Sequence, residues 1–232
     1  MDKMKETLAA GLPELGLNLS DEIQQTLCDF GHAMVKQNEV MNLTGITEDS
    51  AVAKLHLLDS LTVMASADLN GKTLIDVGCG AGFPGVPLAI ASGAKVTLQD
   101  SRGKRMKWLE SCLPQLGIEA ECVTARAEEA VADRRESYDF ATSRAVARLN
   151  ILLELTAPYV KVGGAVLAMK GAAAKEELAE CDNAIRQLGL KLEEVREFPI
   201  DGTSHAVIVL RKVKPTPPKY PRRYAKIKQT PL

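Results

Sequence analysis

The residues most suited to chemistry in this sequence surround a glycine-rich segment. Gly78, Gly80 and Gly82 alternate with other residues, and Asp76 precedes them near the end of a β-branched and apolar run at 73–77. Glycine lets a backbone turn tightly and approach a ligand closely. The helix-compatible segment that follows would offer unpaired N–H groups to an anionic group. A strand, a glycine-rich turn and a helix in this order predict a nucleotide-cofactor site in an open α/β sheet.

The spacing of the glycines distinguishes between cofactors. A dinucleotide fingerprint would have its third glycine where Phe83 stands, and a P-loop would need Lys followed by Ser or Thr, which is absent. The spacing instead resembles the S-adenosylmethionine site of class I methyltransferases. Asp100 supports this interpretation because it lies 24 residues after Asp76, at the end of the next predicted strand, where a carboxylate can accept hydrogen bonds from both ribose hydroxyls. An ordinary tight turn is the alternative, and these features together disfavour it.

The hydrophobic pattern predicts the elements that position these residues. Apolar residues recur at helical spacing over 20–38, and further helices are expected over 3–12 and 48–67. From Lys72 onward strands and helices alternate. Strands are expected at 73–77, 95–99, 120–124, 138–142, 165–169, 191–198 and 205–212, and helices at 85–92, 102–116, 149–159 and 173–188. We therefore predict an α/β fold of the class I S-adenosylmethionine-dependent methyltransferase type, with a Rossmann-like, mostly parallel sheet, an antiparallel edge strand and an N-terminal helical cap.

Composition limits the class of protein. Of 232 residues, 46% are hydrophobic and 25% are charged, as in a soluble globular protein. No apolar run reaches the roughly 18 residues of a membrane-spanning helix, and the first residues lack the apolar core of a secretion signal. The five cysteines are scattered without a C-x-x-C pair, and there are three histidines. We therefore expect a cytoplasmic monomer without a membrane or metal partner.

The C-terminal residues are strongly basic. Residues 211–232 contain eight basic and no acidic residues, although the whole chain has a net charge of −1. An acidic body with a basic tail indicates an anionic partner for the tail, and a solvated, frayed terminus is the alternative. We divide the chain into a helical cap (1–70), a methyltransferase domain (71–213) and a basic tail (214–232) within one structural unit.

Several blocks of sequence resemble the bacterial ribosomal small-subunit methyltransferase G family, also called glucose-inhibited division protein B. These blocks lie at residues 42–44, 56–60, 76–89, 100–105, 142–145 and 170–171. Their combination is specific and extends over nearly the whole chain in the order found in the family. Cys79 stands where Thr is frequent, Trp108 where Phe is frequent, and the tail lacks a glycine often found there. The resemblance implies an enzyme that transfers a methyl group from S-adenosylmethionine to N7 of a guanine in 16S ribosomal RNA, free or in the small ribosomal subunit.

The resemblance also implies site residues. The implied cofactor contacts are Gly78, Phe83, Asp100, Ala127, Glu128 and Arg144, to which the glycine spacing adds Gly80 and Gly82. Ligands of open α/β sheets bind beyond the C-terminal strand ends. Arg144 follows the fourth predicted strand and Lys170 the fifth, so we predict both as catalytic residues that position the substrate. A salt bridge to a neighbouring acid is the alternative for each.

Two further groups of residues carry predictions. The residues expected to contact RNA are Arg148, Arg222, Arg223, Lys226 and Lys228. His56, Asp59 and Ser60 share one face of a predicted helix. They either cover the cofactor or the target guanine, or they tie the cap to the sheet through hydrogen bonds.

The chemistry of methyl transfer agrees with guanine N7. Methylation of an exocyclic amine usually relies on an Asn/Asp-Pro-Pro-aromatic motif, and residues 142–145 read Thr-Ser-Arg-Ala instead. Methylation of pyrimidine C5 needs a cysteine nucleophile, whereas Cys79 lies in the cofactor loop. Guanine N7 already carries a free lone pair and needs positioning rather than a general base. A methyltransferase for protein or a small molecule, a non-catalytic RNA-binding module that senses the cofactor, and a dinucleotide oxidoreductase stay as alternatives.

Overall fold

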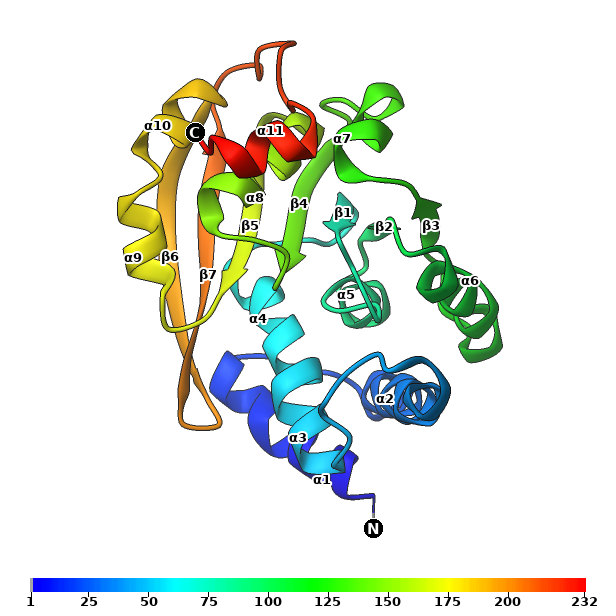
Figure 1. The fold of residues 1–232 in the computed structure, drawn as a ribbon. Coiled ribbons are helices and arrows are strands. Elements are labelled where there is room, and N and C mark those ends of the chain that lie inside the picture. Colours follow the sequence, from blue (N-terminus) through cyan, green and yellow to red (C-terminus); the bar gives the residue numbers. More distant parts are fainter. Residues whose placement is uncertain (1) are drawn as a thin grey trace.

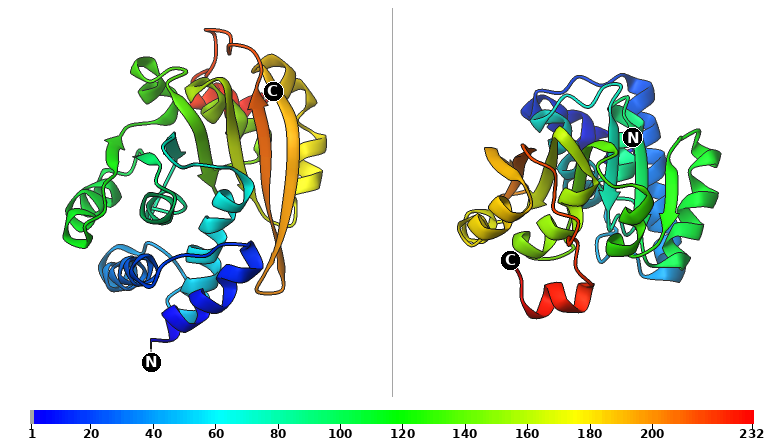
Figure 2. Two further views of the ribbon diagram at one scale, coloured as in Figure 1. Left: turned by 180° about the vertical axis from the view of Figure 1, so that it is seen from behind. Right: turned by 90° about the horizontal axis from the view of Figure 1, so that it is seen from above.

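The computed structural model describes residues 2–232 and consists of a central sheet with helices on both faces (Figures 1 and 2). The strands are β1 (Thr73–Val77), β2 (Lys95–Asp100), β3 (Glu121–Thr124), β4 (Tyr138–Arg144), β5 (Val160–Lys170), β6 (Leu190–Ile200) and β7 (Thr203–Lys212). Within these residues they form a seven-stranded sheet in the order β3-β2-β1-β4-β5-β7-β6. Strands β1 to β5 pair in parallel, and β7 is antiparallel to both of its neighbours. The predicted Rossmann-like sheet with an antiparallel edge is confirmed.

Helices surround the sheet in two groups. The cap contains α1 (Lys3–Gly11), α2 (Asp21–Met41), α3 (Asp49–Val52) and α4 (Asp59–Ser66), and a π-helical turn (Ala53–Leu58) joins α3 to α4. The other helices are α5 (Gly85–Ala91), α6 (Gly103–Cys112), α7 (Ala127–Ala130), α8 (Leu149–Thr156), α9 (Ala174–Ala179), α10 (Asp182–Gln187) and α11 (Tyr224–Gln229). Figure 2 shows the blue N-terminal helices and the red C-terminal helix on opposite sides of the sheet.

The strands alternate between two apolar clusters. In β5, Leu167 packs in the cluster that contains the cap helices, whereas Val166 and Ala168 pack in the cluster that contains α8 and α10. This alternation follows from the two-residue period of a strand. The first cluster runs from Met4 in α1 to Val209 in β7, so the cap and the sheet share one core.

The long cap helix illustrates how local sequence sets its bounds. The Ser20 side chain accepts a hydrogen bond from the Ile23 N–H at 3.3 Å, and acidic residues occupy the first turn. This is the capping pattern that the exposed N–H groups and the helix dipole favour. The helix ends where Asn42 adopts a left-handed conformation at φ 48°. The predicted helix over 20–38 is therefore confirmed and continues for about one further turn.

Two predicted elements differ from the structure. The expected helix over 173–188 is divided into α9 and α10, because the chain bends at Cys181 to bury that side chain in the cluster beneath α8. The expected strand over 165–169 begins earlier, at Val160. Gly164 makes this extension possible, since a Cβ at that position would lie 2.2 Å from the Asp139 carbonyl oxygen.

The C-terminal tail is packed against the protein rather than frayed. The Arg222 guanidinium forms an ion pair at 2.5 Å with Glu154 of α8, whose side chain is fully buried. Ile227 and Tyr220 are also buried, and the Arg135 guanidinium donates to the carbonyl oxygens of Thr216, Pro217 and Tyr220. Arg222, which was expected to contact RNA, therefore has its charge engaged inside the protein. In residues 2–232, none of the helices has the length and apolar character required to cross a membrane.

Candidate cofactor and active site

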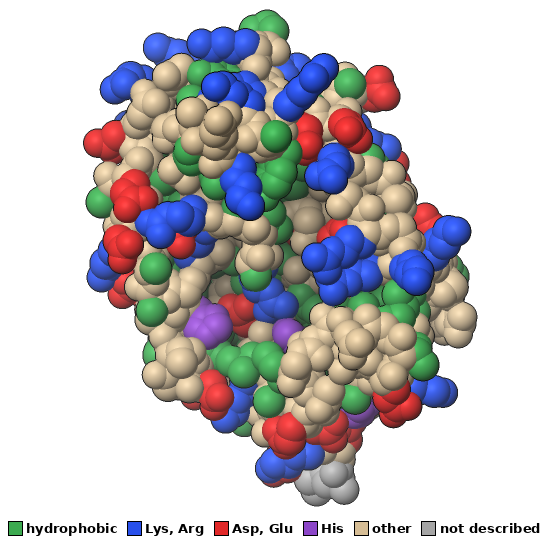
Figure 3. All heavy atoms as spheres, in the orientation of Figure 1, with side chains coloured by type: hydrophobic (Ala, Val, Ile, Leu, Met, Phe, Trp, Pro, Cys, Tyr) green, Lys and Arg blue, Asp and Glu red, His purple; other side chains and the backbone are tan. Residues whose placement is uncertain are grey.

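A cavity of about 520 Å³ lies beyond the C-terminal ends of β1, β2 and β4. Figure 3 shows this face of the molecule hollowed near its centre, with Lys and Arg side chains around the hollow. Of the residues that the sequence predicts for cofactor binding, the cavity walls contain Gly78, Gly80, Phe83, Asp100, Ala127, Glu128 and Arg144. The structure therefore brings together residues that are up to 66 positions apart in the chain.

Gly82 is the predicted cofactor residue that is absent from these walls. Its φ is +97°, and a Cβ there would lie 2.7 Å from Val86, 3.0 Å from Phe30 and 3.1 Å from Leu109. Gly82 therefore lets the loop pack against the cap and α6. This packing role explains the third glycine without a ligand contact.

The glycine loop is fastened to β2 by backbone hydrogen bonds. The N–H groups of Gly78 and Cys79 donate to the Gln99 carbonyl oxygen at 2.8 and 3.0 Å, and the Gly80 N–H donates to Asp100 Oδ2 at 3.0 Å. Gly78 and Gly80 both have positive φ, at +76° and +58°. Only glycine adopts such angles without strain, so the loop depends on glycine at these positions.

Asp100 has the geometry required to hold a ribose. Its second oxygen, Oδ1, accepts the Arg102 N–H at 2.7 Å, so both carboxylate oxygens are oriented by backbone donors at the cavity wall. A carboxylate oxygen can accept more than one hydrogen bond. The two oxygens therefore retain capacity for a pair of adjacent hydroxyls, which fits the nucleoside part of S-adenosylmethionine.

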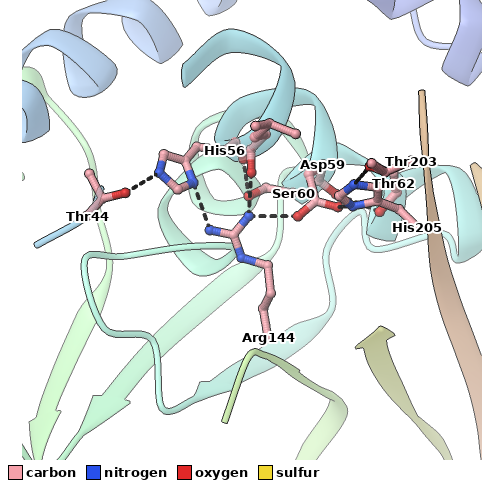
Figure 4. Close-up of polar contacts among 9 residues, drawn as sticks. Thr44, His56, Asp59, Ser60, Thr62, Arg144, Thr203 and His205 are labelled. Atoms are coloured by element: carbon pink, nitrogen blue, oxygen red, sulfur yellow. Dashed lines mark hydrogen bonds and ion pairs between the residues drawn. The ribbon is translucent and has the colours of Figure 1, made fainter. Parts of the chain in front are cut away.

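A polar network connects the cap to β4 and β7 beside the cavity (Figure 4). We call Thr44, His56, Asp59, Arg144 and His205 the Arg144 cluster. Arg144 donates to Asp59 Oδ2 at 2.7 Å and lies 3.1 Å from His56 Nδ1, and Asp59 Oδ1 lies 2.7 Å from His205 Nδ1. His56 Nε2 lies 2.9 Å from Thr44 Oγ1. Ser60 is outside the cluster, since its hydroxyl donates to the His56 carbonyl oxygen.

The charges within the Arg144 cluster are arranged in a definite way. Burial and the nearby Arg144 charge lower the pKa of His56 to about 4, so its ring is neutral at pH 7. Burial tends to raise the pKa of Asp59, but the hydrogen bond from His205 and the charge of Arg144 outweigh it and hold this pKa below its usual range. The hydrogen bond to Asp59 raises the pKa of His205. The cluster therefore holds a buried carboxylate between the Arg144 guanidinium and the His205 ring.

Aromatic packing places the Arg144 cluster against the cofactor loop. The His56 ring stacks on Phe83 with centroids 4.7 Å apart, and the Arg144 guanidinium lies 5.5 Å from the centre of the same ring. The cation above a ring face is an attractive arrangement. The sequence left open whether this part of the cap covers the ligand or ties the cap to the sheet. His56 and Thr44 line the cavity, and hydrogen bonds from Thr44 through His56 to Arg144 also link the cap to the sheet.

Lys170 has a different environment from the one predicted. Its Nζ forms an ion pair with Glu177 at 2.7 Å and donates to the Ala147 carbonyl oxygen at 2.6 Å, and its side chain is 9% exposed. Glu177 also accepts the Leu149 N–H at 2.7 Å. Lys170 therefore supports the 145–148 loop through the salt bridge that was its alternative. It also lines a cavity of about 420 Å³ together with Arg144 and His205, so its role in positioning the substrate stays a prediction.

Arg148, which was expected to contact RNA, is exposed at the surface. It pairs with Glu180 at 2.7 Å and with Glu176 at 3.5 Å. Exposed ion pairs of this kind contribute little to stability, so an RNA phosphate could replace the acidic partners. Arg223, Lys226 and Lys228 are exposed on or beside α11.

The site contains two residues that sequence reasoning missed. Tyr224, at the start of α11, lines the same cavity as Ala127 and Glu128. His205 completes the Arg144 cluster from β7. Neither residue stands in a motif, and no periodic pattern marks them, because their positions depend on long-range packing.

Outside this site, one group of side chains has the composition of a metal ligand set. Asp2, His32 and Asp49 have ligand atoms within 4.8 Å of one another on the surface of the cap. His32 Nε2 lies 3.9 Å from Asp2 and 3.7 Å from Asp49. Asp2 also caps α1, since its Oδ1 accepts the N–H groups of Met4 and Lys5. The absence of a metal from the activity stays a prediction.

Asp76 should make the stability of the protein depend on pH. Its Oδ2 accepts the Gly85 N–H at 2.7 Å, whereas its buried Oδ1 has no hydrogen-bond partner in the described chain. Burial raises the pKa of Asp76 to about 7, against about 3.9 in an unfolded chain. Because the protonated form is favoured in the folded state, stability from this group is present below pH 4 and is lost as pH rises toward 7, by about 4 kcal/mol.

Thermal unfolding of Asp76→Asn at pH 5 and pH 8 tests this expectation. The wild-type melting temperature should fall relative to that of the variant between the two pH values, because asparagine does not ionise. The exposed Asp133→Asn variant is the matched control and should follow the wild type. Parallel pH dependence of the wild type and Asp76→Asn would contradict the assignment.

Comparisons with known proteins are consistent with this geometry. The family described as rRNA small subunit methyltransferase G matches residues 23–205. Proteins named ribosomal RNA small subunit methyltransferase G are similar over nearly their full lengths. The one from Alkaliphilus metalliredigens is 43% identical and covers 94% of this chain and 95% of that protein. The one from Pelotomaculum thermopropionicum is 39% identical and covers 100% of both.

Solved structures share the fold at lower sequence similarity. M. jannaschii TYW2 in complex with AdoMet has a TM-score of 0.55 at 15% identity, covering 67% of this chain and 76% of that one. A TehB-like SAM-dependent methyltransferase from Corynebacterium glutamicum has a TM-score of 0.52 at 18% identity, covering 78% and 98%. At this identity the likeness concerns the fold alone.

Proposed function

Because the chain belongs to the rRNA small subunit methyltransferase G family, we propose that it transfers a methyl group from S-adenosylmethionine to N7 of a guanine in 16S ribosomal RNA. The observation that carries this proposal is the cavity at the strand ends, where the glycine loop, Asp100 and the start of α7 meet. The bound cofactor supplies an electrophilic methyl group on a sulfonium. Asp100 would accept the ribose hydroxyls, and the Gly78–Gly80 backbone would permit close approach.

Guanine N7 suits a site of this composition. N7 attacks through its own lone pair, so no residue has to remove a proton from it. His56 is neutral and already bonded to Thr44 and Arg144, and Arg144 is engaged with Asp59. The protein would accelerate the reaction by holding the base and the cofactor in line. Arg144 would then hold in place the part of the cavity that receives the guanine, because it lies over Phe83 and directly precedes the 145–148 loop.

A route through pyrimidine C5 lacks its nucleophile. Cys79 is buried, and burial raises the pKa of its thiol well above the usual value. The thiolate, which is the reactive form, is therefore disfavoured at neutral pH.

An anionic polymer is a better substrate than a protein or a small molecule. Arg102, Arg105 and Arg126 line the cavity, and their guanidinium groups have no ion-pair partner among residues 2–232. Unpaired arginines at the mouth of a site are suited to phosphate groups. We further propose that the enzyme acts in the cytoplasm as a monomer, on free 16S RNA or on the small ribosomal subunit.

A methyl-transfer assay tests the proposed function. The purified protein is supplied with cofactor labelled in its methyl group and with either 16S RNA or small subunits that lack the modification. Incorporation should map to one guanine, and chemical strand scission at N7-methylguanine identifies the position. Label at another atom would point to a different target, and binding of cofactor and RNA without transfer would indicate a non-catalytic module.

Exposed cations of the tail should contribute to RNA binding. Replacing Arg223, Lys226 and Lys228 together with glutamine removes three exposed charges without changing the ion pair between Arg222 and the buried Glu154. Each phosphate contact on irregular RNA contributes about 0.7 to the slope of log affinity against log salt. The slope for the triple variant should therefore fall by about 2 in RNA-binding titrations at several salt concentrations.

A second triple variant controls for net charge. Lys36, Lys72 and Lys191 are exposed elsewhere in the structure, and their replacement by glutamine changes the net charge equally. The salt slope of this control should match the wild type. An unchanged slope in the tail variant would mean that these tail residues do not contact phosphate.

A further inference from the structure

We infer that Tyr224 of the C-terminal tail is a cofactor-binding residue that forms the aromatic wall for the adenine ring. The inference rests on the proposed function only in that it names the cofactor. The inference is based on the position of α11. This helix follows the last strand of the sheet after eleven residues of irregular chain, and its first residue lines the cavity. The tail would then contribute to the cofactor site as well as to the surface.

The lining of this cavity suits a purine. Besides Tyr224 it includes Val146, Leu155, Ala127 and Glu128. A purine needs flat apolar contact on its faces and polar groups at its edge. Leu155, Val146 and the tyrosine ring provide apolar surface, and Glu128 provides a carboxylate. The same cavity contains the Asp100 carboxylate, whose two oxygens are oriented by the backbone N–H groups of Gly80 and Arg102.

The Tyr224 side chain has no other evident task in the described chain. Its hydroxyl is absent from the hydrogen bonds among residues 2–232, and the residue is half-buried. By contrast, Tyr220 is buried and its hydroxyl donates to Gln187 at 2.6 Å. Tyr220 has the contacts of a packing residue, whereas Tyr224 presents its surface to the cavity.

The fold fixes Tyr224 from both sides along the chain. Two residues before it, Arg222 donates from its backbone N–H and from Nε to Glu154 Oε1, at 2.9 and 2.8 Å. Three residues after it, Ile227 is fully buried. Figure 1 shows α11 in red lying across α8, with which it is in contact. A wall that is already in place costs little ordering when a ligand binds.

Calorimetric titration of the full-length protein with S-adenosylmethionine tests the inference without RNA. Tyr224→Ala should weaken binding by roughly tenfold, within the range that alanine substitution costs when a base loses an aromatic stacking partner. Tyr224→Phe should retain most of the affinity. Gln229→Ala, which trims an exposed residue at the other end of α11, should match the wild type. An unchanged dissociation constant in Tyr224→Ala would overturn the inference.

A double-mutant cycle separates binding from general loss of structure. Arg222→Ala frees the start of α11 and should also weaken cofactor binding, but only through Tyr224. The Arg222→Ala/Tyr224→Ala protein should therefore bind no more weakly than Tyr224→Ala alone. Additive losses would overturn the inference. If the wild-type protein itself does not bind S-adenosylmethionine, the proposed function fails instead, so the two failures are distinguishable.

Discussion

Replacing Gly78 with aspartate should weaken the binding of S-adenosylmethionine by about a hundredfold. Gly78 has a φ of +76°, and a Cβ there would lie 2.5 Å from Val146 Cγ2. Val146 belongs to the cavity wall, so relief of this overlap would deform the site. Left-handed strain costs about 1–2 kcal/mol of fold stability, whereas the overlap with Val146, which typically costs about 1–3 kcal/mol, and the new carboxylate act on the cavity itself. A combined loss of about 3 kcal/mol corresponds to a decrease in affinity of about a hundredfold.

Gly117→Asp is the matched control for Gly78→Asp. Gly117 has a similar φ of +67°, but no atom lies within 4 Å of its Cβ position, and it is remote from the cofactor cavity. This variant therefore carries the same backbone strain and the same added charge. Calorimetry should show wild-type cofactor affinity for Gly117→Asp, with circular dichroism confirming that both variants fold. Retained affinity in Gly78→Asp would remove the glycine loop from the cofactor site.

Local patterns in the sequence account for the cofactor half of the site. Asp76, the glycines and Asp100 each stand at the end of an element that a short hydrophobic pattern predicts. Because parallel strands end at the same edge of a sheet, predicting the strands was enough to bring these residues together. Gly82 marks the limit of this reasoning, since its spacing is that of a ligand contact but its neighbours are Phe30, Val86 and Leu109.

The remaining features depend on pairs that are distant in the chain. Arg222 joins Glu154 across 68 positions, and His205 joins Asp59 across 146. No periodicity indicates which acid a given base will contact. The tail was therefore predicted as a basic segment, whereas a buried ion pair and Ile227 fold it into α11. Lys170 shows the same limit, because Glu177 reaches it from a neighbouring helix.

Arg144→Ala should lower both stability and turnover, for separable reasons. The Arg144 and Asp59 side chains are 19% and 6% exposed. Removing one member of a buried pair leaves the other charge uncompensated, which typically costs about 3–5 kcal/mol. Asp59 keeps the hydrogen bond from His205, so we expect about 3 kcal/mol in denaturant unfolding. Turnover should fall by about a hundredfold, as when reacting groups lose their alignment.

The double variant Asp59→Asn/Arg144→Ala separates the two effects. Asparagine removes the uncompensated charge and can still accept the hydrogen bond from His205, so most of the lost stability should return. Turnover should stay low, because the cation over Phe83 is still missing. Asp59→Asn alone is the matched control, since it retains Arg144. If the double variant recovers turnover together with stability, the Arg144 cluster serves only to tie the cap to the sheet, and substrate positioning belongs to other residues.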